Sequence, residues 1–164
     1  MTELRFSPSQ LRALDRQKEH LVSAAEQLLL DAEILAIPQK DLGHSQLKNL
    51  LAMAAETESP KVVTSFVRYQ MGRDSHSESW ARRNAAGHSF GELLIAAVES
   101  GAVLSAVDAA ASEVDGLEGP LRQMAHVHML RHFLGFMGRY LKYLESSRAQ
   151  RSSKPSSSRR QGGR

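Results

Sequence analysis

The sequence of 164 residues contains no cysteine. The chain therefore cannot form a disulfide framework, a thiolate zinc site or an iron–sulfur cluster, and it cannot use a cysteine nucleophile. Any catalytic activity would have to depend on other residue types.

Long hydrophobic runs and a secretory signal are also missing from the sequence. We find no apolar run that approaches the roughly 18 residues a membrane-spanning helix needs. The opening residues, MTELRFSPSQ, lack the basic segment and apolar core of a signal peptide. We therefore expect a cytoplasmic protein.

Motifs for metal, cofactor or phosphate chemistry are scarce. The sequence has no glycine-rich phosphate loop and no Glu-x-x-His pair of the di-iron bundles. His128 and His132 have the spacing of two metal ligands on one helix face, but no glutamate follows His128 as in the HExxH motif. We therefore predict a protein that is not an enzyme and that holds no metal ion or other cofactor.

Positive charge is concentrated at the C-terminal end of the chain. Residues 146–164 contain six basic residues and no acidic one, which leaves 15 of the 21 basic residues against all 18 acidic residues in 1–145. A segment of Ser, Arg and Gly cannot bury enough apolar surface to offset the entropy of ordering, so we predict a disordered tail over 146–164. Such a tail either adds non-specific affinity for RNA or DNA or only increases solubility.

Residues 1–145 have helical periodicity and predict one all-α domain, a compact bundle of five to six helices. Ser7, Pro8 and Gln10 form a strong helix start, and the apolar spacing that follows predicts one long helix over about 8–36. Ser45 is expected to cap the next helix. Further helices are expected from Pro60 toward Gly72, over 89–99, over 102–114 and over 121–145, with a polar loop over 73–87.

The last predicted helix carries a basic stripe next to a wide apolar surface. His128, His132, Gly135, Arg139 and Lys142 recur at helical spacing. A glycine in such a row lets a phosphate approach closely, because no side chain blocks it. The stripe is either a phosphate-binding face or an ordinary solvated helix face.

Three segments between Ser45 and Glu145 share motifs and order with one family. They are SQLKNLLAMA at 45–54, FVRYQMGRD at 66–74 and RHFLGFMGRYLKYLE at 131–145. Together they resemble the small subunit of type III-A CRISPR–Cas effector complexes, the Csm complexes. A closely related small subunit of another type III system is the other possibility within this resemblance.

The resemblance implies a non-catalytic helical subunit that acts in antiviral defence. Such a subunit contacts the backbone of the guide RNA and target RNA duplex, other effector subunits and copies of itself. Phosphate contacts are independent of base sequence, which suits a complex whose specificity comes from base pairing. Matching positions assign RNA binding to Lys48, Arg68, Arg73, Arg139 and Lys142, with Arg131 as a weaker candidate; Tyr69 and Tyr140 are expected in the core or at helix caps.

A second class of function is a stand-alone helical adaptor. Its basic tail would tether it to nucleic acid, and its long first helix would bind a partner. The two hypotheses differ in which charges matter, those on the helices or those in the tail.

Overall fold

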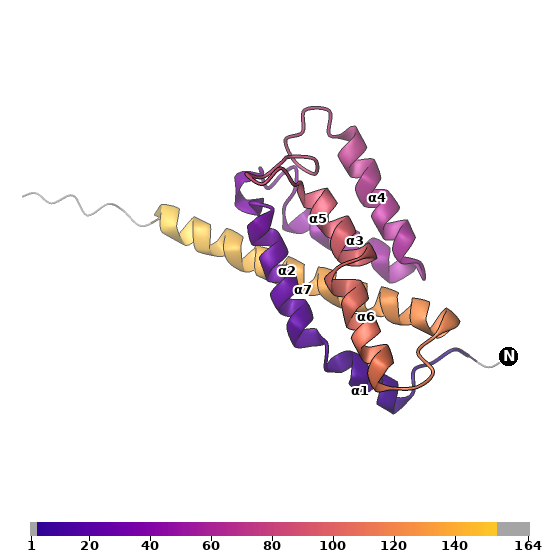
Figure 1. Ribbon diagram of the computed structural model, residues 1–164. Coiled ribbons are helices and arrows are strands. Elements are labelled where there is room, and N and C mark those ends of the chain that lie inside the picture. Colours follow the sequence, from indigo (N-terminus) through magenta and orange to yellow (C-terminus); the bar gives the residue numbers. More distant parts are fainter. Residues whose placement is uncertain (1–2, 154–164) are drawn as a thin grey trace, which may run out of the picture.

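The computed structural model describes residues 3–153, which form a helical bundle (Figure 1). The predicted all-α fold is confirmed: within this range the chain has helices and one isolated β-bridge, between Arg83 and Ser89. The helices are α1 (Pro8–Asp15), α2 (Lys18–Asp31), the 3₁₀ helix η1 (Ile34–Ala36), α3 (His44–Glu56), α4 (Pro60–Arg73), α5 (Phe90–Glu99), α6 (Ala102–Glu113) and α7 (Gly119–Ser153).

Helix α7 is the element on which the bundle is built. It passes behind the other helices in Figure 1, and α2, α3 and α6 all pack against it. Its side chains at Phe133, Leu134 and Met137 are completely or almost completely buried. The core forms here because α7 is apolar around much of its circumference and must be covered on several sides.

The first helical segment is two helices, so the prediction of a single helix over 8–36 is wrong. The helix breaks at Arg16 and Gln17, where the Gln17 N–H donates to the Leu14 carbonyl at 3.1 Å in a tighter turn. Both side chains reach Glu113 at the end of α6, at 2.8 and 3.2 Å. The bend allows α1 to pack against α6 while α2 packs against both α6 and α7.

The caps explain where the other helices begin. Ser7 and Gln10 form the predicted capping box of α1, and Ser89 and Glu92 form one at α5. Helix α3 begins two residues earlier than predicted: its N-cap is Gly43 and not Ser45, and the Gly43 N–H donates to the Gln46 side chain at 2.8 Å. Ser45 is therefore inside the helix and is not its cap.

Helix α7 continues eight residues beyond its predicted end. Residues 146–153 are helical, so the predicted disorder is wrong for this part of the tail. Continuing an existing helix adds one hydrogen bond per residue, and Arg148 also donates to the Leu35 carbonyl at 2.6 Å. The rest of the predicted tail, 154–164, lies outside the described residues.

One segment is more apolar than the sequence analysis allowed. Phe90–Glu113 has a mean hydropathy of 1.7 over an 18-residue window, so by length and composition it resembles a membrane span. In the structure it is two helices, α5 and α6, which separate at Ser100 and Gly101, and α6 packs against α1, α2 and α7. Helices in the core of a bundle reach the same hydropathy, so this segment is weak evidence for membrane insertion.

Candidate nucleic-acid interface

The six basic residues assigned to RNA binding fall into two groups. Arg68 and Arg131 form ion pairs and hydrogen bonds that join helices to one another or to a neighbouring helix end. The other four are exposed and form no ion pair within residues 3–153: Lys48, Arg73, Arg139 and Lys142.

Arg68 of α4 forms a two-pronged ion pair with Glu99 of α5. Its two terminal nitrogens each donate to a carboxylate oxygen at 3.0 Å. The hydrogen bond from Arg68 lowers the pKa of Glu99 below its ordinary value, against the opposing effect of burial. A phosphate group would have to displace Glu99 to reach this guanidinium.

Arg131 of α7 satisfies the C-terminal end of α3. Its Nε donates to the Ala54 carbonyl at 2.7 Å and its Nη2 to the Thr57 carbonyl at 2.9 Å. The last carbonyls of a helix have no partner within the helix, so an arginine placed there binds them in their stead. Arg131 would have to leave these carbonyls to contact RNA.

Arg73 and Lys48 lie on separate surfaces. Arg73 is the last residue of α4, and its guanidinium lies 5.7 Å from the centre of the Tyr69 ring. The sequence predicts a helix that runs from Pro60 toward Gly72, and the structure continues it through Gly72 to Arg73. Lys48 is exposed on α3. Arg73 lines a pocket that contains neither Arg139 nor Lys48.

Cationic side chains lie next to aromatic rings on the C-terminal half of α7. A groove of about 440 Å³ lies between α2 and α7, lined by Phe136, Arg139, Tyr140 and Tyr143 together with Val22 and Glu26. The Arg139 guanidinium lies 5.8 Å from the centre of the Phe136 ring. The rings of Tyr140 and Tyr143 are stacked with centres 5.9 Å apart, and Tyr143 is 63% exposed.

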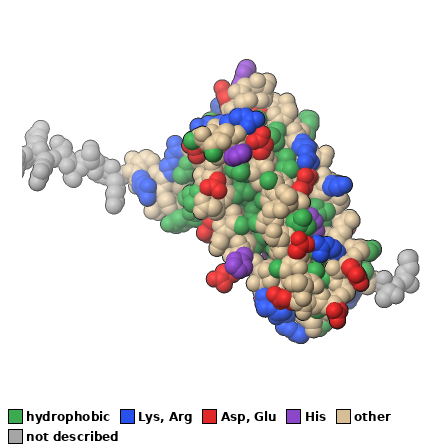
Figure 2. Space-filling view, viewed as in Figure 1, with side chains coloured by type: hydrophobic (Ala, Val, Ile, Leu, Met, Phe, Trp, Pro, Cys, Tyr) green, Lys and Arg blue, Asp and Glu red, His purple; other side chains and the backbone are tan. Residues whose placement is uncertain are grey.

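A second hollow continues this groove toward the end of α7. It has a volume of about 680 Å³, is also lined by Tyr140 and Tyr143, and adds Arg148 and Arg151. Figure 2 shows Lys or Arg side chains next to hydrophobic ones on this projecting end of the molecule. We define the α7 surface as these six residues: Phe136, Arg139, Tyr140, Tyr143, Arg148 and Arg151.

Arg148 and Arg151 are the residues that sequence reasoning missed. They were assigned to a disordered tail and so were not considered part of a folded site. A signal was present, since Tyr140, Leu144, Ser147 and Arg151 continue the three- and four-residue spacing of the helix. Tyr140, expected in the core or at a cap, is half-buried and forms a wall of both hollows.

The histidine end of the predicted basic stripe is not cationic. The His128 ring packs against Phe6 and His132, with ring centres 5.6 and 4.7 Å apart. Burial, together with nearby positive charge, lowers the pKa of His128 to about 4, and burial also lowers the pKa of His132. Both rings are therefore neutral at neutral pH. In the part of the chain that the structure covers, no cluster of three or more His, Asp or Glu residues could hold a metal ion.

One sequence motif needs its structural context. Gly87–Gly91, with the sequence GHSFG, has the G-x-S-x-G spacing of a hydrolase nucleophile turn. In such a turn the serine follows a strand and is exposed, but here Ser89 is 1% exposed and caps α5, where its hydroxyl accepts the Glu92 N–H at 3.2 Å. The motif therefore does not form a nucleophile site here.

The chain matches no protein-family model, and comparisons with curated proteins and with solved structures give no significant match. The resemblance to the type III small subunit therefore depends on the three segments alone. They lie in α3, α4 and α7, which pack against one another.

Proposed function

We propose that this protein is a non-catalytic RNA-binding subunit and that it binds RNA through the α7 surface. The observation that carries the proposal is a stacked tyrosine pair, the half-buried Tyr140 and the exposed Tyr143, between arginines on both sides, in two hollows that share a wall. Proteins that bind single strands combine a basic groove with aromatic rings on which bases stack.

The α7 surface supports affinity without base selectivity. Arg139 and Arg151 have the charge to contact phosphates, Arg148 can do so with the guanidinium nitrogens that its bond to the Leu35 carbonyl does not use, and Tyr143 offers a ring face to a base. Stacking of one base on such a ring contributes about 1–3 kcal/mol, and each phosphate contact on a single strand adds about −0.7 to the slope of log affinity against log salt. Glu26 in the same groove opposes the phosphate backbone and keeps the expected affinity modest.

The finer proposal is the small subunit of a type III CRISPR effector complex in the cytoplasm. Support comes from the three segments and from the rigid helical block that carries the α7 surface. Its partners would be guide RNA, target RNA, other effector subunits and copies of itself. Co-purification with the other subunits of such a complex, and protection of target RNA in it, would test this assignment.

The α7 surface is tested by RNA binding in a salt series. Fluorescence polarisation with a labelled single strand should show weaker binding for Tyr143→Ala and Arg151→Ala. Tyr69→Ala is a matched control, since Tyr69 is 60% exposed and lies on α4. Arg12→Ala is the charge control, because Arg12 is exposed on α1. Equal losses in the variants and in the controls would contradict the proposal.

A truncated chain distinguishes the adaptor hypothesis, in which the tail binds nucleic acid, from RNA binding by the α7 surface. A chain that ends at Ser153 keeps α7 and loses only residues 154–164. It should still bind RNA, with a flatter salt dependence. Complete loss of binding would show that the tail, and not the α7 surface, holds the nucleic acid.

A further inference from the structure

One carboxylate lies in the groove between α2 and α7, next to the residues of the α7 surface. Glu26 of α2 lines this groove of about 440 Å³ together with Arg139, Tyr140 and Tyr143 of α7. Among the described residues that line the second hollow, which shares the two tyrosines, none is acidic. Glu26 is therefore the single carboxylate that residues 3–153 place in the two hollows of the proposed RNA site.

The Glu26 carboxylate has no partner within residues 3–153. Its side chain is half-buried and forms neither a hydrogen bond nor an ion pair in this part of the chain. Arg139 lines the same groove, but its guanidinium lies over the Phe136 ring, 5.8 Å from the ring centre. Water solvates a carboxylate in an open groove, so a ligand that displaces this water must supply a hydrogen-bond donor in its place.

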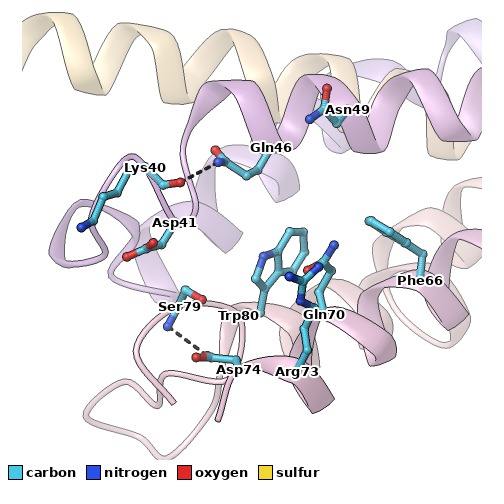
Figure 3. Close-up of a pocket in the computed structure, with 10 residues that line it drawn as sticks. All are labelled: Lys40, Asp41, Gln46, Asn49, Phe66, Gln70, Arg73, Asp74, Ser79 and Trp80. Carbon is cyan, nitrogen blue, oxygen red and sulfur yellow. Dashed lines mark hydrogen bonds between the residues drawn. The ribbon is translucent and has the colours of Figure 1, made fainter. Parts of the chain in front are cut away.

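Carboxylates in other hollows of the bundle differ from this one. Asp74 lines a pocket of about 350 Å³ between α3 and α4, where it accepts the backbone N–H of Ser79 at 3.0 Å (Figure 3). Glu33 lines another hollow and accepts the Ala85 N–H at 3.0 Å. Asp41, in the pocket of Figure 3, is also unpaired within residues 3–153, but that pocket shares no residue with the α7 surface. The unpaired carboxylate of the α2–α7 groove is thus the one that a strand on the α7 surface would meet.

The chemistry of a nucleotide determines which of its groups can face Glu26. A carboxylate repels a phosphate, and the proposed function places the phosphates on the arginines of α7. A base stacked on Tyr143 turns its ring face to the protein. The sugar joins this base to its phosphates, and in RNA it carries a 2′-hydroxyl, which can donate a hydrogen bond to a carboxylate. Because Tyr143 and the arginines belong to α7 and Glu26 to α2, we expect the sugar to lie between the two walls of the groove.

We propose that Glu26 makes the α7 surface selective for RNA over single-stranded DNA, by accepting a hydrogen bond from a ribose 2′-hydroxyl. This selectivity rests on the proposed function and adds to it the sugar that the site recognises. Deoxyribose has no hydroxyl at the 2′ position, so a DNA strand would leave the carboxylate without a donor and close to its phosphates. The site would then distinguish the sugar while remaining indifferent to the base.

Fluorescence polarisation with labelled uracil strands tests the sugar alone. Ribose and deoxyribose strands of uracil differ only at the 2′ position, and uracil has no exocyclic amino group that could bind the carboxylate instead. The full chain should bind the ribose strand about tenfold more tightly, the factor that corresponds to one charge-assisted hydrogen bond. A 2′-fluoro strand, which keeps the sugar conformation of RNA but has no hydroxyl, should bind like the deoxyribose strand.

Variants of Glu26 assign the preference to its carboxylate. Glu26→Ala removes both the acceptor and the repulsion of phosphates, so the deoxyribose strand should bind more tightly and the preference for ribose should disappear. Glu26→Gln keeps an oxygen that accepts, and should keep part of the preference. Glu19→Ala is the matched control, because Glu19 is an exposed glutamate of the same helix that lines neither hollow. It should leave the ratio of the two affinities unchanged.

Three results would overturn the role of Glu26 and leave the proposed function standing. The first is equal binding of the ribose and deoxyribose strands by the parent. The second is an unchanged ratio of the two affinities in Glu26→Ala. The third is a 2′-fluoro strand that binds like RNA, which would show that the conformation of the sugar sets the preference. Failure of the parent to bind either strand would instead refute the α7 surface as an RNA site, and the selectivity with it.

Discussion

Replacement of Arg131 by alanine is expected to destabilise the bundle and to leave RNA affinity unchanged. The Arg131 side chain is 33% exposed and donates to the Ala54 and Thr57 carbonyls, at 2.7 and 2.9 Å. These carbonyls lie at the end of α3 and have no partner within the helix. Removing the guanidinium leaves them without a donor in a partly buried place.

The size of the effect follows from these contacts. A hydrogen bond from a charged donor contributes about 1.5–3 kcal/mol when buried, and a cation at a helix C-terminus adds about 0.3–1 kcal/mol. Because a third of the side chain is exposed, the lower ends apply. We expect a loss of about 2–4 kcal/mol. In a domain of this size, where 1 kcal/mol shifts the Tm by about 2–4 °C, the Tm should fall by about 5–15 °C.

Thermal and urea denaturation followed by circular dichroism measure the stability, and polarisation measures RNA affinity. Arg131→Lys keeps the positive charge but lacks the planar guanidinium that reaches two carbonyls at once. Its stability should therefore lie between that of the parent and that of Arg131→Ala. Arg12→Ala is the control, since that side chain makes a single 3.3 Å hydrogen bond to Ser9. A Tm within about one degree of the parent, together with weaker RNA binding, would refute this reasoning and show Arg131 to be a phosphate contact.

Three further perturbations test the electrostatics. Glu99→Gln should lower the free energy of unfolding at neutral pH but not in strong acid. The hydrogen bond from Arg68 lowers the pKa of Glu99 in the folded protein, so the ion pair stabilises the fold fully above the ordinary pKa of 4.5. This stabilisation is lost as the pH falls through the lowered pKa. His128 has its pKa lowered from 6.5 to about 4, so stability should be complete above pH 6.5 and fall as the pH drops toward 4, and urea titrations of His128→Gln should show a smaller fall. Arg82→Met should raise the Tm, because Nη1 of Arg82 is buried and meets no hydrogen-bond partner among residues 3–153; a lower Tm would contradict this.

The starts of α1 and α5 were predictable because their signals are local. Ser7 with Gln10 and Ser89 with Glu92 are capping pairs three residues apart, and the structure forms both. The break at Arg16 and the continuation of α7 past Glu145 were not predictable from such signals. Each depends on a distant partner, Glu113 for the first and the Leu35 carbonyl for the second.

The basic residues show the same difference between local signals and distant partners. Arg139 and Lys142 were identified from spacing along one helix, and both are exposed on α7. Arg68 and Arg131 fitted family motifs equally well, but their partners lie 31 and 77 residues away in the sequence. No pattern along the chain shows that an arginine will meet a carboxylate or a helix end after folding.

The distribution of paired and unpaired cations is the reason why we propose RNA contact at the α7 surface and not elsewhere on the bundle. Residues 1–145 are net acidic. Ion pairs such as Arg16–Glu113 and Arg122–Asp108 join helical segments of the body, and Arg83–Glu92 joins the loop after α4 to α5. The net charge of the body does not attract a phosphate backbone, so attraction depends on places where unpaired cations gather.

Unpaired cations gather on the C-terminal half of α7, and this part of the helix is also fixed to the rest of the bundle. Glu145 accepts the His44 N–H at the start of α3, at 3.2 Å, and Arg148 donates to the Leu35 carbonyl. These two contacts fix the helix on both sides of the point where it leaves the body. Binding to a surface that is already ordered does not lose the free energy of arranging it. Under the proposed function, a short row of arginines and one exposed tyrosine would therefore contact RNA without sequence preference.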